Sequence, residues 1–354
     1  MSQPLSSDRQ PRIAIVRLSA VGDCVQTMPL ACALRDRFPA AHLVWVVEQG
    51  PAPLVQTVAA VDRVITVPKK FALSLDGLRR LRAELRRERI DVVLDPQGLT
   101  KSALVGWLAG VPRRIGFARP AGREISPWLQ TELVASGAQH RVDRYLELLQ
   151  PLGIERPRVR FGIQLPAQAK EMAAEFASRP ELRGGYAALN PGAGWDSKRW
   201  PVERFALVAR RLAQSGVPSV ITWGGRRERA WAEQIVSQSQ GAAQLAPPTS
   251  LVELAAVLAH AKLFVGGDTG PLHLAAAMGT PCVALFGSSL AAACGPYGDG
   301  HIAIQAALDA SPRRKAPGAD NWAMRAISPE QVAAACDQLL DRRGRHLDES
   351  QAAA

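Results

Sequence analysis

The sequence predicts an α/β protein built from two doubly wound domains that face each other across a cleft. Short apolar runs typical of buried strands alternate with amphipathic stretches typical of helices, and this alternation starts afresh after residue 185. The chain has 354 residues, which is too long for one typical core and fits two domains. No apolar run reaches the roughly 20 residues that span a bilayer.

The first half carries the strand and helix signals of a parallel sheet with helices on both faces. The predicted strands cover 13–16, 42–47, 64–67 and 90–94, and the predicted helices run from a loop at 19–23 to about 38 and over 71–89. Residues 151–184 contain four prolines and few strong patterns, so we expect them to connect the domains.

The second half repeats the rhythm. We predict strands at 186–190 and 219–223, helices at 202–214, 228–237 and 251–260, and a strand–loop–helix–strand unit over 264–286. Residues 311–327 are expected to form a flexible loop, and 329–340 a last helix. The expected domains are therefore 1–165 and 166–327. The remaining segment, 328–354, is a helix and tail that we expect to pack back on the N-terminal domain.

Charge is unevenly distributed along the chain. Residues 1–165 hold 24 Lys and Arg against 15 Asp and Glu, a net charge of +9, whereas the rest of the chain has a net charge of +2. The basic half implies an anionic partner: nucleic acid, an acidic membrane surface, or a phosphorylated or carboxylated substrate. Part of this excess, the arginines between 79 and 89, is expected to be only the solvated face of a helix.

Other residue types exclude several classes of protein. The five cysteines are scattered and form no C-x-x-C pair, so we expect reduced thiols instead of disulfides or a zinc site. The polar N-terminus lacks the apolar core of a secretory signal, so we expect a cytoplasmic protein. No Asp-x-Asp motif is present, and we expect neither a metal nor a cofactor. A nucleic-acid-binding protein is suggested only by basicity, because no recognition helix or zinc spacing supports it.

The most informative segment is 264–286. In it, Asp268, Thr269 and Gly270 stand where a parallel strand ends and a helix begins. Backbone N–H groups at a helix start have no partner inside the helix, and anionic phosphates bind there. The alternative is that Asp268 or Thr269 only caps the helix.

Four further loops follow predicted strands. Asp23 is placed to act as a general base, or else caps its helix. The turn 95–101 contains Gln97 and Lys101, and an ordinary loop with a positive φ at Gly98 is the alternative. The loop 190–201 offers two glycines and Lys198 for a diphosphate, although its spacing is not that of a Walker motif. In 223–228, a carboxylate at Glu228 can hold ribose hydroxyls or cap a helix.

Taken together, five motifs resemble the heptosyltransferases of glycosyltransferase family 9 over nearly the whole chain. They are Arg-Leu-Ser-Ala-Val-Gly-Asp at 17–23, Asp-Pro-Gln-Gly-Leu-Thr-Lys-Ser-Ala at 95–103, Lys-Arg-Trp-Pro at 198–201, Trp-Gly at 223–224 with an acid at 228, and Asp-Thr-Gly-Pro-Leu-His at 268–273. The similarity is greatest to the heptosyltransferase I branch of lipopolysaccharide inner-core synthesis.

This resemblance implies a GT-B fold and an inverting, metal-independent transfer of heptose from ADP-heptose to Kdo of Kdo2-lipid A. It implies that Asp23 is the base, that 1–165 binds the acceptor and that 166–327 binds the donor. The implied donor-binding residues are Lys198, Glu228, Asp268, Thr269, Gly270, His273, Ala193, Gly194 and Thr249. The implied acceptor-binding residues are Arg123, Lys69, Lys70, Gln97 and Lys101. Ala193 and Gly194 replace hydroxyl residues of the family, and Thr249 replaces a methionine beside the adenine.

Three alternatives remain open from the sequence. The chain is a second heptosyltransferase or a family member that uses another sugar or acceptor, or it belongs to another class, as a nucleotide-sugar-binding module without catalysis or a nucleic-acid-binding protein. Asp23 argues against a non-catalytic module. The basic half also predicts peripheral contact with the anionic inner-membrane face, and we expect a monomer.

Overall fold

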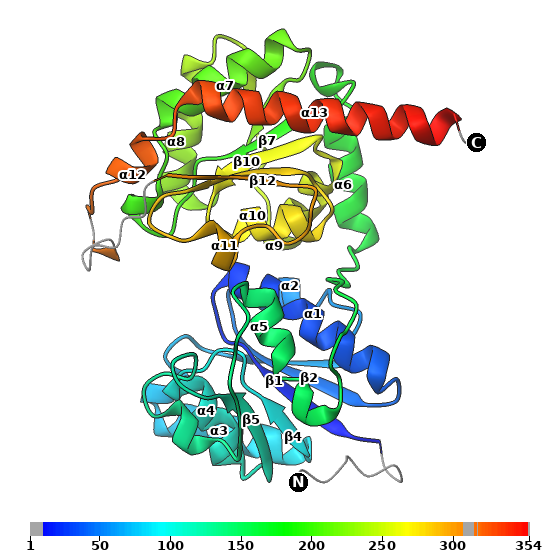
Figure 1. The fold of residues 1–354 in the computed structure, drawn as a ribbon, viewed down its shortest axis with the longest axis vertical. Helices are drawn as coiled ribbons and strands as arrows, with labels where there is room; N and C mark the ends of the chain where they lie inside the picture. The colour runs from blue at the N-terminus through cyan, green and yellow to red at the C-terminus, as the bar shows by residue number, and fades with distance from the viewer. Residues whose placement is uncertain (1–9, 307–314, 317, 353–354) are drawn as a thin grey trace. The chain divides into compact units, whose positions relative to one another are not determined.

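The computed structural model describes residues 10–306, 315–316 and 318–352. The chain divides into two compact units, 1–164 and 165–354, so the division falls one residue before the expected domain boundary. Each unit is a six-stranded parallel sheet with helices on both of its faces (Figure 1). The prediction of an α/β protein with two doubly wound domains is therefore confirmed.

In the first unit the strand order is β3-β2-β1-β4-β5-β6, and all pairs are parallel. One face of the sheet packs on α3 and α4, while α1 and α5 contact each other (Figure 1). The strands are β1 (Arg12–Val16), β2 (His42–Glu48), β3 (Arg63–Val67), β4 (Val92–Leu94), β5 (Arg113–Phe117) and β6 (Glu132–Val134). The helices are α1 (Val21–Arg37), α2 (Ala52–Val55), η1 (Phe71–Leu73), α3 (Leu75–Arg87), α4 (Thr100–Ala109), η2 (Ser126–Leu129), α5 (Arg141–Glu147) and η3 (Gln150–Leu152).

In the second unit the order is β12-β11-β10-β7-β8-β9, again with parallel pairs only. The strands are β7 (Ala187–Asn190), β8 (Ser219–Ile221), β9 (Ala243–Leu245), β10 (Leu263–Gly267), β11 (Cys282–Phe286) and β12 (Ile302–Gln305). The helices are α6 (Ala167–Ala177), η4 (Pro180–Leu182), η5 (Asp196–Lys198), α7 (Val202–Gln214), α8 (Gly225–Gln238), α9 (Leu251–His260), α10 (Gly270–Ala277), α11 (Ala291–Cys294), α12 (Trp322–Arg325) and α13 (Pro329–Ala352).

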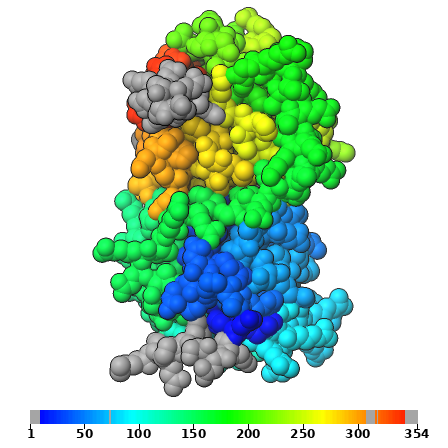
Figure 2. Space-filling model, turned by 90° about the vertical axis from the view of Figure 1, so that its right-hand side faces the viewer, coloured from blue at the N-terminus to red at the C-terminus, as the bar shows by residue number. Residues whose placement is uncertain are grey.

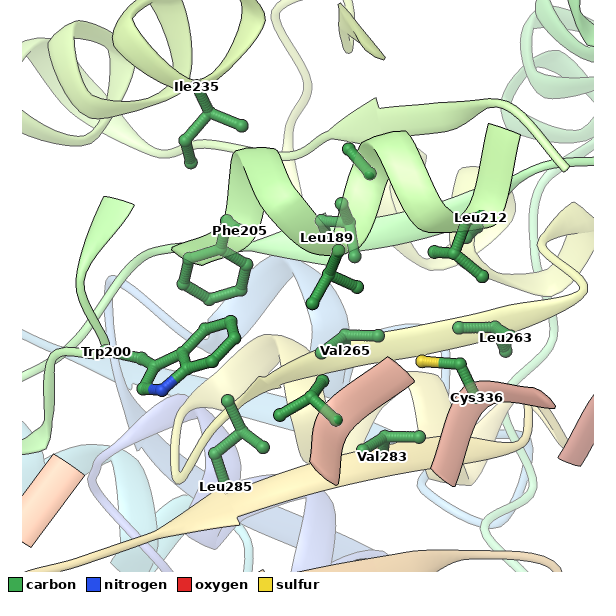
Figure 3. Close-up of a cluster of buried hydrophobic side chains, with 14 of the residues drawn as sticks. Leu189, Trp200, Phe205, Leu212, Ile235, Leu263, Val265, Val283, Leu285 and Cys336 are labelled. Atoms are coloured by element: carbon green, nitrogen blue, oxygen red, sulfur yellow. The ribbon is translucent and has the colours of Figure 1, made fainter. Parts of the chain in front are cut away.

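The core of the second unit lies between its sheet and the helices α7, α8 and α13. Alternate residues of neighbouring strands point to the same face, so Leu189, Val265 and Leu285 share it with helix side chains (Figure 3). Trp200 meets Phe205 edge to face, with ring centroids 4.8 Å apart. On the other side α10 packs on β10 and β11, and α6 lies beside α9 (Figure 2).

The last helix belongs to the second unit. Its buried residues Val332, Ala335, Cys336 and Leu339 recur every three or four positions and join the core beneath α7. An apolar face of the helix is thus buried in the second unit, and the expectation that the segment packs on the N-terminal domain stays a prediction. The helix also continues to residue 352, beyond the predicted end at 340.

Several elements differ from the sequence prediction for local reasons. The predicted helix 71–89 is broken at Ser74, whose hydroxyl accepts a hydrogen bond from the Gly77 N–H at 3.2 Å and starts a new helix. The predicted connection 151–184 contains α6, whose apolar side is made mostly of small alanines. The predicted flexible loop contains α12, while its residues 311–314 and 317 lie outside the described part of the chain.

The strand orders define one topological switch point in each unit. In the first, the chain moves outward from β1 to β3 on one side and from β4 to β6 on the other, so the switch lies between β1 and β4. In the second it lies between β7 and β10. Open α/β sheets bind ligands at the carboxyl ends of the strands that flank such a point. Each unit therefore has one expected ligand-binding position, at its switch point.

Candidate functional site

The switch point of the second unit holds a buried cluster around Asp268, which directly follows β10. Its Oδ2 lies 2.5 Å from Lys198 Nζ, and its Oδ1 lies 3.4 Å from His273 Nε2. Lys198 ends η5 in the loop after β7, and His273 lies in the first turns of α10. The cluster thus joins the two loops that flank the switch point, as the sequence predicts for these three residues.

Charge compensation governs this cluster. Burial alone would raise the pKa of Asp268, but the hydrogen bond with His273 and the charge of Lys198 outweigh it and hold that pKa well below its ordinary value. Asp268 is therefore a carboxylate, and it holds the Lys198 ammonium beside the carboxyl end of β10. The Sγ of Cys294 also approaches the Asp268 carboxylate, at 3.7 Å.

The start of α10 is not capped by a side chain. Thr269 is the N-cap residue in extended conformation, and its hydroxyl donates to the Gly267 carbonyl at 3.2 Å instead of accepting from the helix. The Asp268 carboxylate is engaged by Lys198 and His273. The alternative that either residue serves only as a helix cap is therefore wrong. The N–H groups of Gly270 and Leu272, on either side of Pro271, which has none, lie at a helix end of the kind that suits an anion.

Glu228 lies in the first turn of α8, after β8. Its Oε2 accepts a hydrogen bond from the Gly224 N–H at 2.7 Å, so Glu228 does cap the helix. Its binding of ribose hydroxyls stays a prediction. The other oxygen lies against Gly192 in the loop after β7: a Cβ atom added there would be 2.7 Å from Oε1. Burial raises the pKa of Glu228, which the hydrogen bond from Gly224 opposes.

The remaining predicted donor residues occupy the neighbouring loops. Ala193 is half-buried and Gly194 exposed, both after β7, while the half-buried Thr249 follows β9. The loop after β7 is braced by an ion pair between Asp196 and Arg227, with a separation of 2.5 Å. Strands β10, β7, β8 and β9 are adjacent, so all of these loops line one edge of the sheet.

At the switch point of the first unit, Asp23 is the third residue of α1. Its Oδ2 lies 2.8 Å from an Arg17 Nη atom, and its Oδ1 lies 3.1 Å from Arg141 Nη1. The carboxylate also accepts from the Ala20 N–H at 3.3 Å, so it does cap the helix start. Asp23 does more than cap the helix. Two guanidinium groups hold its carboxylate in place, and its side chain is 24% exposed, so the carboxylate is accessible.

Arg17 is the buried side chain that holds the Asp23 carboxylate in place. It directly follows β1 and is almost fully buried, with one guanidinium nitrogen donating to the Pro96 carbonyl at 3.0 Å. Its guanidinium lies 5.1 Å from the ring centroid of Tyr145. Burial lowers the pKa of Arg17, but Asp23 more than offsets this, so the pKa lies above its ordinary value. Arg17 therefore ties the loops after β1 and β4 to the carboxylate.

The predicted acceptor residues of the β4 loop have structural partners. Gln97 is buried, and its Oε1 accepts from the Leu18 N–H at 2.8 Å, which joins the loops on both sides of the switch. Lys101 Nζ lies 2.9 Å from Glu48 Oε1 at the end of β2. Both residues lie near the switch point, and their contact with an acceptor stays a prediction.

The other predicted acceptor residues lie on the surface. Arg123 is exposed, and its backbone N–H donates to the Gly98 carbonyl at 2.9 Å. Gly98 has a φ of 62°, as the sequence predicts. Lys69 and Lys70 are exposed after β3, the edge strand, two strands away from β1. The structure therefore brings Arg123 to the β4 loop, but it leaves the two lysines at the sheet edge.

Asp95 is a buried carboxyl that the sequence did not single out. It follows β4 and accepts hydrogen bonds from the N–H groups of Gln97 and Gly98, both at 3.1 Å. Burial outweighs these hydrogen bonds and raises its pKa from 3.8 to about 6. Its side chain thus braces the β4 loop from below.

The raised pKa of Asp95 predicts a pH effect on stability. The folded protein binds a proton here more strongly than the unfolded chain does, so the contribution of Asp95 to the free energy of unfolding falls as pH rises from about 4 to about 6. Two units of pKa correspond to roughly 3 kcal/mol. We expect the stability of the wild type relative to Asp95→Asn to decline over this range, measured by urea unfolding at each pH. If the difference in free energy of unfolding between the two proteins did not change with pH, the prediction for Asp95 would be contradicted.

Sequence reasoning missed several residues of both sites. Arg141 contacts Asp23 from 118 positions away, and no local pattern marks it. Cys294 reaches Asp268 in the same manner across 26 positions. Arg17 has a signal, because an arginine at the end of an apolar strand run begins the motif that ends in Asp23. Gly192 is predicted only as one of the two glycines that give backbone access in its loop.

Within the described ranges, no group of three or more His, Cys, Asp and Glu side chains is arranged to hold a metal ion. No helix in the described part of the chain is long and apolar enough to cross a membrane.

Comparison with known proteins gives consistent results. The model of glycosyltransferase family 9 (heptosyltransferase) matches residues 78–321. The lipopolysaccharide heptosyltransferase 1 of Escherichia coli K12 is 31% identical over 306 residues, which cover 83% of this chain and 93% of that protein. The corresponding Pseudomonas aeruginosa PAO1 protein is 29% identical and covers 85% of both chains.

Solved structures agree. A family 9 glycosyltransferase from Veillonella parvula superposes with a TM-score of 0.80 at 25% identity, covering 94% of this chain and 97% of that one. The E. coli heptosyltransferase WaaC, solved with ADP, gives a TM-score of 0.73 at 26% identity and covers 93% and 99%. These matches confirm the GT-B fold class. With its motifs at the two switch points, the chain belongs to glycosyltransferase family 9, the heptosyltransferases, and is a transferase enzyme.

Proposed function

We propose that the protein transfers heptose from ADP-heptose to Kdo of Kdo2-lipid A, with inversion at the anomeric carbon and without a metal ion. The observation that carries the proposal is the Lys198–Asp268–His273 cluster at the start of α10, in a chain whose relatives are named lipopolysaccharide heptosyltransferase 1. A fixed ammonium beside a helix N-terminus suits the diphosphate of a nucleotide sugar.

On the donor side, the difficult step is departure of ADP, because negative charge grows on the diphosphate as the glycosidic bond breaks. Lys198 and the backbone N–H groups of Gly270 and Leu272 are positive groups placed beforehand where that charge develops. They perform the task that a divalent cation performs in other transferases. Glu228 accepts hydrogen bonds from the ribose, and Asp268 holds Lys198 and the heptose.

On the acceptor side, Asp23 takes the proton of the attacking Kdo hydroxyl. Arg17 and Arg141 keep the carboxylate ionised, which is the form a base requires. Bonding to the anomeric carbon makes the hydroxyl acidic, and its proton then passes to the carboxylate. The proton ends on Asp23, and ADP leaves with the electron pair of the broken bond.

A direct assay tests the proposal. Purified protein is incubated with ADP-heptose and Kdo2-lipid A, with and without EDTA, and the product is analysed by mass spectrometry and by NMR of its anomeric carbon. We expect one heptose added with inverted configuration in both conditions. Transfer only to an acceptor that already carries heptose would indicate a heptosyltransferase II, and transfer only from UDP- or GDP-sugars would indicate another donor.

The arrangement of Glu228 and Gly192 gives a prediction for donor binding. Glu228→Gln should weaken ADP affinity roughly tenfold, because a charged hydrogen bond to a ribose is lost. Gly192→Ala should have a similar effect, since the new methyl group would displace the Glu228 carboxylate. Gly300→Ala, in the same unit but outside the predicted donor residues, is the matched control, because no atom lies within 4 Å of its added Cβ. Equal ADP affinity of all four proteins in calorimetry would remove Glu228 from the site.

We further propose that the enzyme is a monomer at the cytoplasmic face of the inner membrane. The basic first half, with its net charge of +9, supports contact with an anionic surface. Light scattering on the purified protein measures the first part of this proposal directly.

A further inference from the structure

One surface of the first unit combines exposed apolar side chains with arginines. Trp128 in η2 is 79% exposed, Trp107 in α4 is 50% exposed, and Ile125 just before η2 is 44% exposed. Helix α4 contacts both η2 and α3. We call these three residues the apolar edge. Large exposed side chains gathered on contacting elements mark interaction sites more often than single ones do.

Helix α4 extends the apolar edge. From Ser102 to Ala109 the helix contains no charged residue, and Leu104, Trp107 and Leu108 recur at helical spacing on its less buried side. The neighbouring Lys101 is turned to Glu48, with 2.9 Å between the charged atoms. The outward side of α4 is therefore apolar, which is unusual for a surface helix.

Helix α3 supplies the charge beside it. Five of its thirteen residues are arginines, and their side chains lie on the exposed side: Arg79, Arg80, Arg82, Arg86 and Arg87. Of its two acids, Asp76 pairs with Arg80 at 2.6 Å and Glu84 with Arg63 at 3.0 Å. In the sequence these arginines suggest only a solvated helix face. In the structure, the helix that carries these arginines contacts α4, which belongs to the apolar edge.

We propose that this surface docks on an anionic lipid bilayer, with the apolar edge in the interface and the α3 arginines on the headgroups. Tryptophan and aliphatic side chains belong to the headgroup–acyl boundary, and basic residues flank them in proteins that lie on membranes. This inference rests on the proposed function, because an acceptor with acyl chains is presented at such a surface. A protein partner would bury the tryptophans without requiring the arginines.

Vesicle sedimentation tests the surface. Wild-type protein should bind phosphatidylglycerol–phosphatidylethanolamine vesicles at low salt and bind phosphatidylcholine vesicles weakly. Trp107→Ser with Trp128→Ser should reduce binding by roughly tenfold or more, from the loss of buried apolar area. Leu207→Ser, at a 41% exposed position of α7 in the second unit, is the matched control and should bind like the wild type.

The charge contribution has its own variants. Arg79→Gln with Arg82→Gln should weaken binding roughly 25-fold, because each basic residue near an anionic surface contributes about a factor of five. The same two changes at Arg183 and Arg210, in the second unit, are the control. Equal loss in both pairs would show that only the net charge of the protein matters and would overturn the proposal.

Fluorescence locates the apolar edge. Brominated lipids should quench the tryptophan emission of the wild type, and the doubly substituted Trp107→Phe, Trp128→Phe protein should keep vesicle binding but lose most of that quenching. Unchanged quenching in this variant would place the membrane contact elsewhere. A wild-type dimer that the serine variant converts to a monomer, with no vesicle binding by either, would assign the surface to a second copy of the chain.

Activity separates this inference from the proposed function. On a Kdo acceptor without acyl chains, the serine variant should transfer heptose as fast as the wild type, whereas on acceptor in vesicles it should be slower. Loss of transfer to both acceptors would show that the two tryptophans are needed for the reaction itself, and it would overturn their docking role. Vesicle binding by a wild type that transfers no heptose would refute the function and leave the surface intact.

Discussion

Asp23→Ala protein is expected to transfer heptose roughly 10²–10⁴ times more slowly than the wild type, the usual contribution of a general base. Its affinity for ADP should be unchanged, because the donor residues lie in the other unit. The alanine also leaves the buried Arg17 without its carboxylate, so stability should fall by about 3 kcal/mol. Turnover, ADP calorimetry and thermal unfolding together separate these effects.

Asp23→Asn is the sharper variant. Its side-chain oxygen still accepts from the Ala20 N–H and from Arg17, so the start of α1 and the loop after β1 keep their bonds. It cannot take a proton at neutral pH. We expect a smaller loss of stability than in the alanine variant, together with the same loss of turnover. An asparagine variant with wild-type turnover would remove Asp23 from the mechanism.

Lys198→Met should lower turnover by about 10²–10³, as expected when a group that stabilises transition-state charge is removed. It should also weaken ADP binding, and by more than the loss of one contact. The reason is Asp268, whose carboxylate lies 2.5 Å from the lysine and would then face the phosphates without the ammonium that offsets its charge. Kinetics and calorimetry with ADP provide the two measurements.

A double-mutant cycle tests that reason. Asp268→Asn added to Lys198→Met should restore part of the ADP affinity, because it removes the repelling charge, and turnover should stay low. Additive losses of affinity in the double variant would mean that the two side chains act independently. Retained turnover in the single lysine variant would assign the leaving-group role to other groups.

Much of the fold follows from the sequence, because buried parallel strands are short apolar runs that glycine and polar loops delimit. Helices α7 and α9 begin and end as predicted, at 202–214 and 251–260. In contrast, β5 begins with two arginines and β6 has only three residues, so neither has a strong pattern. Helix α6 was missed because alanine is weakly apolar, although Ala169, Ala173 and Phe176 are buried.

The candidate sites follow the same division. Loops after strands are visible in the sequence, so Asp23, Lys198 and Asp268 could be named. Their partners could not: Arg141 reaches Asp23, and Cys294 reaches Asp268, through tertiary packing alone. The capping alternatives also needed coordinates, since a carboxylate at a helix start has the same local sequence whether it binds an N–H group, as Glu228 does, or a lysine, as Asp268 does.

The ion pair between Lys198 and Asp268 also bears on how the catalytic cycle ends. ADP carries more negative charge after transfer than its diphosphate did in the intact nucleotide sugar, so a pocket with uncompensated positive potential would retain the product. Asp268, 2.5 Å from the ammonium, offsets part of that potential. On the proposed function, we therefore expect the pairing to lower the affinity for the bound nucleotide and to speed the departure of ADP, so that one carboxylate sets the rate at which spent nucleotide is exchanged for fresh.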